Sequence, residues 1–186
     1  VLDAGADIKA QPIDLVAYAN FGTTICKNVF DIKQPRIGLL NVGTETHKGN
    51  DQLRKASSLL EKESLNREFK YVGFVEGSDF SSNKVNVIVT DGFTGNIALK
   101  TAEGTANLIK QFFAQEFKGS ATGIFSGLIL KRRLQKLKEK MDPRRLNGGV
   151  FVGLNGLVIK SHGSSDSKSF YSALKLAKNV CKNQYT

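Results

Sequence analysis

Residues 41–50, with the sequence NVGTETHKGN, combine residue types that suit anion binding. They follow an apolar run and precede a stretch with helical periodicity, so they connect a predicted strand to a predicted helix. A helix that begins after Asn50 directs unpaired backbone N–H groups and the positive end of its dipole at this loop, and Lys48 adds a full charge. We therefore interpret Lys48, Gly49 and Asn50, with Glu45 in support, as a phosphate-binding group. The alternative is a glycine-containing turn with a helix cap and a solvated lysine, because motifs of this kind are weak signals.

A second set of chemistry-bearing residues lies in the stretch 90–100, TDGFTGNIALK. Asp91 ends a predicted strand, and Gly92 and Gly95 permit a close approach of the backbone to a ligand. Asn96 lies at or near the start of a helix, where its amide can cap the helix or donate a hydrogen bond to a substrate oxygen. We assign Asn96 to catalysis and the other three to phosphate binding, with helix capping as the alternative for Asn96.

The third stretch, KSHGSSDSK at 160–168, places His162 at the end of a predicted strand. This histidine is a candidate proton donor, and a hydrogen-bonded loop residue is the alternative. The sequence contains no G-x-S-x-G and no H-E-x-x-H motif, and Cys26 and Cys181 fall within predicted helices. A covalent acyl-enzyme mechanism therefore has no obvious nucleophile, and we expect neither a metal nor a cofactor.

The elements that must position these residues alternate between strands and helices. Continuous apolar runs predict buried strands at 36–42, 71–75, 85–90 and 151–159, with residues 1–4 at the end of another. Three- and four-residue apolar spacings predict helices at 12–29, 51–65 and 166–182. The pattern indicates an α/β fold with a largely parallel sheet flanked by helices. In such a sheet the loops that follow the strands share one edge, where ligands usually bind.

Residues 97–142 depart from this alternation and predict a helix hairpin. Two apolar stripes are separated by the glycine-rich segment 119–123, and Pro143 ends the second. Apolar residues precede a basic segment at 131–145, which has eight basic side chains and two acidic ones. This pattern is typical of a surface that enters an anionic membrane, and a packed helix with a solvated basic face is the alternative. The predicted membrane contacts are Ile124, Phe125, Leu128, Ile129, Lys131, Arg132 and Arg133.

The composition indicates one globular domain. A chain of 186 residues with 40% hydrophobic content can bury a sizeable core, so we predict a single α/β domain over 1–186. The two cysteines are far apart, which favours a reducing cytoplasm. The formal charge is +10, but the cations are not interleaved with aromatic residues, so nucleic acid is not expected as a partner. The chain starts at what looks like the end of a core strand, and we expect it to be part of a longer protein.

Five blocks together resemble, in order and spacing, the C-terminal part of the PlsX family of bacterial phosphate acyltransferases. The blocks are LDAGAD, RIGLLNVGTETHKGN, VEGSD, VIVTDGFTGNIALKTAEG and VIKSHGSSD. The resemblance extends from residue 1 to the last predicted helix, and it is specific because several long blocks agree. It implies transfer of a fatty acyl group from acyl carrier protein to inorganic phosphate, which yields acyl phosphate for phospholipid synthesis.

The same resemblance implies a fold like that of isocitrate and isopropylmalate dehydrogenases and a homodimer at the membrane surface, with paired hairpins touching the membrane. It suggests that Lys48 holds the phosphate and that Asn96 stabilises the oxyanion, with His162 in a supporting role. Thr46 and His47 stand where family members vary, which leaves His47 without an assigned role. Two alternatives stay open: a phosphotransacetylase-like enzyme that uses short acyl-CoA, and a catalytically incomplete fragment for dimerisation and membrane docking.

Overall fold

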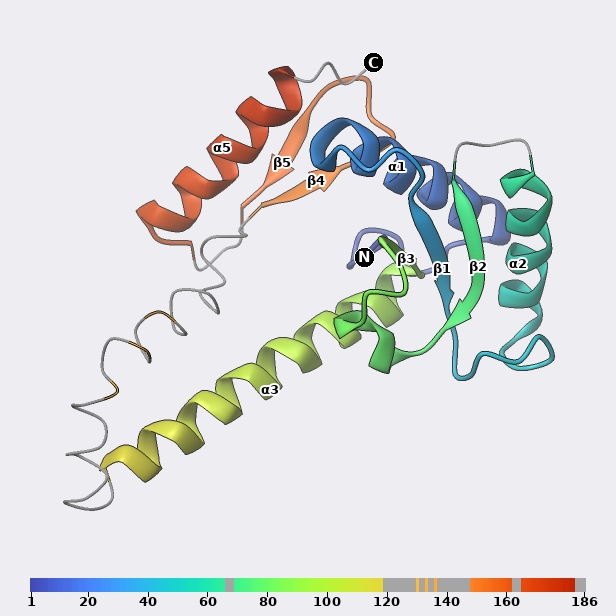
Figure 1. The fold of residues 1–186 in the computed structure, drawn as a ribbon. Coiled ribbons are helices and arrows are strands. Elements are labelled where there is room, and N and C mark those ends of the chain that lie inside the picture. The colour runs from blue at the N-terminus through green and yellow to red at the C-terminus, as the bar shows by residue number, and fades with distance from the viewer. Residues whose placement is uncertain are drawn as a thin grey trace. The chain divides into compact units, whose positions relative to one another are not determined.

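The computed structural model describes residues 1–65, 69–118, 148–161 and 165–182, together with the single positions 130, 133 and 136. The chain divides into two compact units, whose boundary falls within one helix, between Lys100 and Thr101 (Figure 1). Among the described residues, the first unit holds those of 1–100 and the second those of 101–182. We describe each unit separately.

A three-stranded parallel sheet forms the centre of the first unit. Its strands are β1 (Arg36–Leu40), β2 (Lys70–Val75) and β3 (Val87–Val89), in the order β2-β1-β3. Both neighbours run parallel to β1, and Leu2 forms a further parallel bridge with Val89 (Figure 1). The predicted parallel α/β arrangement is therefore confirmed for this unit.

Two helices cover one face of this sheet. They are α1 (Pro12–Phe30), which begins with proline in its first turn, and α2 (Asp51–Ser64), which begins after Asn50. Their apolar faces pack on the side chains that β1 and β3 direct to that face, and the shared core includes Leu15, Ala19, Ile37, Leu39, Leu60, Val87 and Val89. A smaller cluster of Leu40, Val75 and Ile88 lies on the other face with Phe80 of the short 3-10 helix η1 (Gly77–Ser81). Burial on both faces explains why these strands are continuously apolar.

The helix α3 (Gly92–Lys118) starts five residues earlier than the predicted hairpin. The tip and most of the second arm of the predicted hairpin 97–142 lie outside the described residues. So do six of the seven predicted membrane contacts: Ile124, Phe125, Leu128, Ile129, Lys131 and Arg132. The seventh, Arg133, is helical and exposed. No helix in the described part of the chain has the length and apolar character needed to cross a membrane.

The second unit contains a two-stranded antiparallel sheet, which corrects one of our predictions. Residues 151–159 do not form a single strand: β4 (Gly149–Phe151) pairs with β5 (Val158–Lys160), and the residues between them reverse the chain direction. Gly153 in this connection has φ +78°, a left-handed conformation that breaks an extended strand. The helix α5 (Ser167–Lys182) follows, close to its predicted bounds.

Candidate functional site

The parallel register places three of the four predicted loops at one edge of the sheet. The carboxyl ends of Leu2, β1 and β3 lead into residues 3–7, 41–50 and 90–96, and these strands all run in the same direction. The loop after β2 begins at Glu76 and belongs to the same edge. The fourth predicted loop, 161–166, belongs to the second unit, and His162 lies outside the described residues. The candidate site is therefore built from the first unit.

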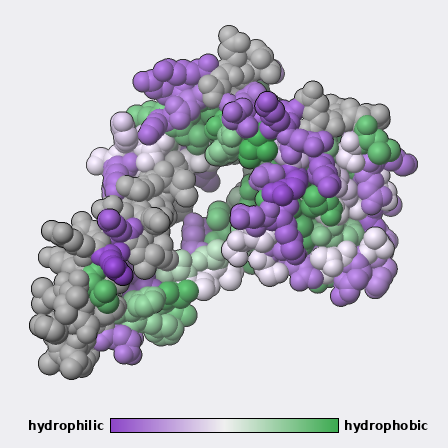
Figure 2. Space-filling view, in the orientation of Figure 1, coloured by the Kyte–Doolittle hydropathy of each residue, from purple (hydrophilic) through white to green (hydrophobic). Residues whose placement is uncertain are grey.

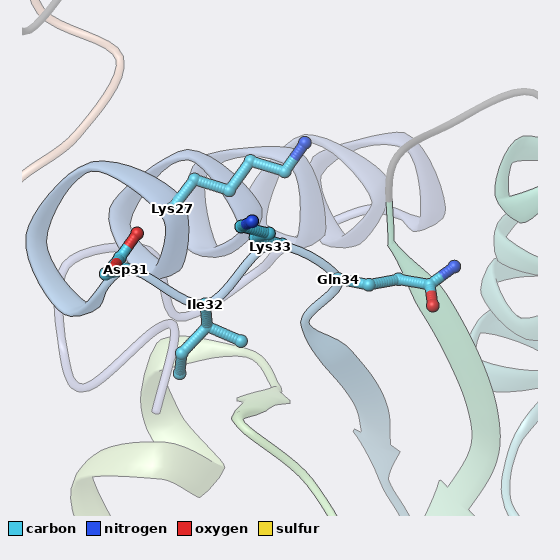
Figure 3. A pocket seen from close by; sticks show the side chains of 5 residues that line it. All are labelled: Lys27, Asp31, Ile32, Lys33 and Gln34. Carbon is cyan, nitrogen blue, oxygen red and sulfur yellow. The ribbon is translucent and has the colours of Figure 1, made fainter.

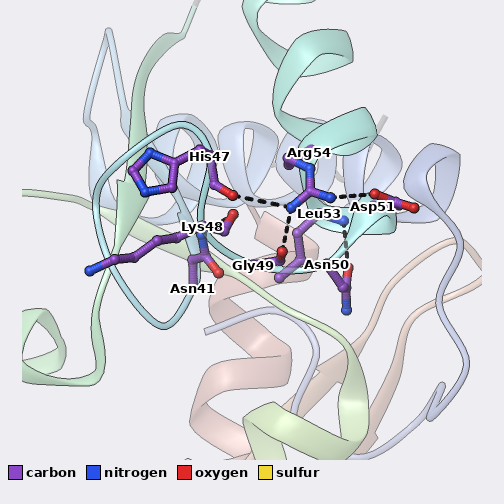
Figure 4. A network of polar contacts seen from close by, with 8 residues as sticks. All are labelled: Asn41, His47, Lys48, Gly49, Asn50, Asp51, Leu53 and Arg54. Carbon is purple, nitrogen blue, oxygen red and sulfur yellow. Dashed lines mark hydrogen bonds and ion pairs between the residues drawn. The ribbon is translucent and has the colours of Figure 1, made fainter.

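The loop 41–50 is closed by its first residue, Asn41. The backbone N–H of Asn41 donates to the carbonyl of Val75 at 2.8 Å, which continues the hydrogen bonding between β1 and β2 past the end of the strand. In the side chain, Oδ1 accepts from the N–H of Val42 at 2.9 Å and Nδ2 donates to the carbonyl of Lys48 at 3.2 Å. The residue is only 8% exposed. Both polar atoms of a nearly buried amide thus hold the loop backbone. Figure 4 shows Asn41 beside Lys48 and Gly49.

Gly49 fits against this amide for a steric reason. Its φ is +82°, and a Cβ atom at this position would lie within 3.0 Å of three atoms of the Asn41 side chain. Both the left-handed backbone and the close approach therefore exclude a larger residue. Glycine is therefore required at position 49 by packing within the loop.

The end of the loop is held to the first turn of α2. Asn50 is the N-cap, and its Oδ1 accepts from the N–H of Leu53 at 2.9 Å. The guanidinium of Arg54 donates to the carbonyls of His47, at 3.2 Å, and of Gly49, and it also pairs with Asp51 (Figure 4). Arg54 therefore connects the helix to the two residues on either side of Lys48.

The ammonium of Lys48 pairs with the carboxylate of Glu45 across Gly43. Nζ lies 2.9 Å from Glu45 Oε1, and the two side chains are 42% and 49% exposed. A Cβ at Gly43 would lie 2.8 Å from Glu45 Oε2 and 2.9 Å from Lys48 Nζ, so glycine leaves the space that this ion pair occupies. The hydrogen bond and charge of Glu45 raise the pKa of Lys48, with a smaller effect from the charge of Glu76. The hydrogen bond from Lys48 in turn lowers the pKa of Glu45. Lys48 is therefore a cation at neutral pH, and it is accessible to solvent.

The start of α3 forms a second group at the same edge. Asp91 caps the helix: Oδ1 accepts from the N–H of Thr94 at 2.8 Å, and Oδ2 accepts from its hydroxyl at 2.7 Å. The alternative that Asn96 caps the helix is therefore wrong, because Asn96 lies more than one turn into α3. The amide of Asn96 instead lies near Gly5, where an added Cβ would be 3.5 Å from Asn96 Oδ1.

Gly92 and Gly95 bring α3 into close contact with residues 3–7. A Cβ at Gly92 would lie 2.8 Å from the carbonyl oxygen of Asp7, and one at Gly95 would lie 1.9 Å from that of Asp3. The N–H of Gly92 donates to the Asp7 carbonyl at 2.7 Å. The carboxylate of Asp3 in turn accepts from the N–H groups of Gly5, Ala6 and Asp7 at 2.6 to 3.1 Å. These contacts give both glycines a packing function, which is independent of any phosphate.

The predicted site residues of the first unit thus form two groups at one edge of the sheet. One surrounds Gly43 and contains Glu45 and Lys48; the other is the start of α3. Sequence reasoning missed Asn41, Arg54 and Glu76. Asn41 and Glu76 are polar residues directly after buried strands, a signal that we applied to Asp91 but not to them. Nothing in the local sequence distinguishes Arg54 from an ordinary solvated helix residue.

An open pocket of about 510 Å³ lies elsewhere, at the connection between α1 and β1 (Figure 3). It is lined by Lys27, Asp31, Ile32, Lys33 and Gln34 and lies beside the amino end of β1, so it contains none of the predicted site residues. In the described portion of the chain, no group of three or more histidine, cysteine, aspartate or glutamate side chains is arranged to hold a metal ion.

Comparison with known proteins supplies the family. The family model described as fatty acid synthesis protein matches residues 1–186. Over 177 residues the chain is 51% identical to the phosphate acyltransferase of Jannaschia sp. (strain CCS1), an alignment that covers 95% of this chain and 48% of that protein. It is 50% identical to the phosphate acyltransferase of Dinoroseobacter shibae and 49% identical to that of Roseobacter denitrificans; both alignments cover 100% of this chain, with 48% and 52% of the relatives.

The chain therefore spans about half the length of the curated relatives it matches. Among solved structures, the EutD phosphotransacetylase from Staphylococcus aureus aligns over 56% of this chain and 37% of that chain, with 16% identity and a TM-score of 0.44. The match of the family model over every residue, together with relatives at about half identity, establishes that the chain belongs to the fatty acid synthesis protein family, the PlsX family that its sequence blocks resemble.

Proposed function

We propose that the protein containing this chain transfers a fatty acyl group from acyl carrier protein to inorganic phosphate and so forms acyl phosphate for phospholipid synthesis. Membership of the family and the name phosphate acyltransferase carried by the relatives support transfer of an acyl group to phosphate. The observation that carries the proposal is the cationic, half-exposed side chain of Lys48 on a loop held at the carboxyl edge of the sheet.

Phosphate binding needs an exchange of partners at Lys48. In the structure its ammonium is paired with the carboxylate of Glu45. Phosphate near neutral pH carries up to two negative charges and has more acceptor oxygens than a carboxylate, so it competes for this cation effectively. The N–H groups at the start of α2, after Gly49 and Asn50, add donors and the positive end of the helix dipole. Asp91, Gly92 and Gly95 would shape the far side of the phosphate site.

The reaction itself then needs no nucleophile from the protein. A phosphate oxygen attacks the thioester carbonyl carbon, and the carbonyl electrons move onto oxygen to give a tetrahedral oxyanion, which the Asn96 amide stabilises. Collapse of this intermediate breaks the C–S bond and releases acyl phosphate. The thiolate of the carrier receives the proton that hydrogen phosphate lost, with His162 as the donor in that transfer. The loop that carries Lys48 follows β1, and the helix α3 that carries Asn96 follows β3; the two strands are adjacent, about 4.8 Å apart.

A homodimer at the cytoplasmic membrane surface belongs to the same proposal. Apolar side chains of α3 stay exposed in this single chain, and Figure 2 shows hydrophobic surface over this helix. They include Leu108, Ile109, Phe112 and Phe113, which are 43 to 57% exposed and repeat at four-residue spacing. This stripe supports a helix hairpin at 97–142 that packs on a second copy, with its tip on the membrane. A dehydrogenase-like fold of the whole protein and the absence of a nucleic-acid partner complete the proposal.

The substitution Lys48→Ala in the intact protein tests the role of the phosphate site. Removing one charge-assisted contact costs about 1.5–3 kcal/mol, so we expect the phosphate KM to rise about 10- to 100-fold, or activity to be lost. The measurement is acyl phosphate formation from long-chain acyl carrier protein at varied phosphate concentration.

Two controls make this test specific. Lys62→Ala removes an exposed lysine from the last turn of α2, and its phosphate KM should match the wild type. Acetyl-CoA replaces the carrier in a parallel assay, and a preference for acetyl-CoA would instead favour a phosphotransacetylase-like activity. Unchanged phosphate kinetics in Lys48→Ala would remove Lys48 from the mechanism.

A further inference from the structure

Asn41 connects the two ends of the loop that carries Lys48. Its side-chain amide accepts from the N–H of Val42 at the start of the loop and donates to the carbonyl of Lys48 near the end. Asn41 lies beside Lys48 and Gly49 in Figure 4. We propose that Asn41 is a positioning residue for Lys48, which sets the affinity for phosphate without touching it. This inference rests on the phosphate-binding role proposed above.

The geometry separates the anchor from the group that it positions. Asn41 is 8% exposed and its own N–H is bonded to Val75, so the amide is fixed to the sheet. Lys48, by contrast, has a side chain that is 42% exposed and a flexible four-carbon stem. Fixing the backbone of Lys48 limits the volume that its ammonium can occupy, and a smaller volume lowers the entropy lost when the ammonium binds an anion.

The loop backbone occupies both polar atoms of the Asn41 side chain. Oδ1 and Nδ2 are both engaged by the loop backbone, and Gly49 packs directly against them. A Cβ at Gly49 would lie within 3.0 Å of three atoms of this side chain, so the glycine and the amide fit together. Asn41 therefore acts through Lys48 and Gly49, and its loss should alter phosphate binding rather than the acyl-transfer step.

The variant Asn41→Ala in the intact protein tests this assignment. We expect the phosphate KM to rise about 10-fold, since the loss of a hydrogen bond that holds a binding group has an effect of up to this order, while kcat at saturating phosphate and the KM for acyl carrier protein stay within about twofold of the wild type. The matched control is Asn86→Ala. Asn86 also holds a backbone N–H, that of Arg36 at 2.9 Å, but at the opposite end of β1, so its variant should keep the wild-type phosphate KM.

A second variant covers the case in which the alanine variant does not fold. Asn41→Leu keeps the size of the side chain and removes both hydrogen bonds, and it should raise the phosphate KM in the same way. The inference is overturned if every Asn41 variant that folds keeps a phosphate KM within twofold of the wild type. It is also overturned if these variants lower kcat without raising the phosphate KM, or if Asn86→Ala raises the phosphate KM as much as they do.

Calorimetric titration with inorganic phosphate alone distinguishes failure of this inference from failure of the proposed function. Wild-type protein that binds phosphate but transfers no acyl group would refute the proposed function, and weaker phosphate binding by Asn41→Ala would still support the positioning role. Equal phosphate affinity in the wild type and in Asn41→Ala would refute the positioning role, whatever the acyl-transfer activity.

Discussion

Replacing Gly95 by alanine places a methyl group against the backbone of residues 3–7. The added Cβ would lie 1.9 Å from the carbonyl oxygen of Asp3 and 2.8 Å from Cγ2 of Thr90. Ordinary contact requires ~3.5 Å, so α3 and the Asp3 backbone would have to separate by about 1.5 Å. No side-chain rotation relieves this clash, because the closest atom belongs to the main chain.

The cost follows from two opposing effects. Overpacking of this kind destabilises by about 1–3 kcal/mol, and a clash with the backbone belongs at the upper end of that range. Alanine stabilises a helix by about 1 kcal/mol relative to glycine, and this gain offsets part of the destabilisation. We therefore expect Gly95→Ala to lower the free energy of unfolding by about 2 kcal/mol, a substantial part of ordinary protein stability.

Gly104 of the same helix provides the matched control. Within the described residues no atom lies within 4 Å of a Cβ built at Gly104, so Gly104→Ala should retain the helix-propensity gain of about 1 kcal/mol. Urea denaturation of the two variants beside the wild type should show shifts of the midpoint in opposite directions. A Gly95→Ala variant as stable as Gly104→Ala would refute the close packing of α3 on residues 3–7.

Two further substitutions test the cap and the pH dependence. Asp91→Ala removes the N-cap of α3 and should destabilise by about 1 kcal/mol, measured by the same denaturation; an unchanged midpoint would show that Asp91 does not cap. The hydrogen bond and charge of Lys84, with the N–H of Glu76, hold the pKa of Asp79 below its usual value. The ionised Asp79 carboxylate therefore contributes its full stabilisation above the unfolded pKa of about 4, and this stabilisation disappears as pH falls through the lower folded pKa. The difference in free energy of unfolding between wild type and Asp79→Asn should accordingly narrow from pH ~5 to pH ~2.5. A difference that stays constant across that range would contradict this linkage.

The local elements and the general position of the site could be read from the sequence because their signals lie within short windows. The apolar runs at β1 and β3 and the helical spacing in α1 and α2 are periodic patterns, and Asn50 precedes α2 as an N-cap should. Alternation of strands and helices was enough to predict a parallel sheet with its loops at one edge. The failure at residues 151–159 has the same origin, since an apolar run alone does not distinguish one strand from two short strands joined by Gly153.

The sequence alone determined which residues carry charge and hydrogen-bonding groups after each strand, and so which loop could hold an anion. Only the tertiary structure decided that Lys48 pairs across Gly43, that Asn41 holds its backbone, and that Gly95 meets Asp3. The last contact joins residues 92 positions apart, and it depends on Leu2 lying beside β3 in the sheet. Strand order is set by the packing of the whole core, so no local pattern contains it, whereas the chemistry of each side chain is present in the sequence from the start.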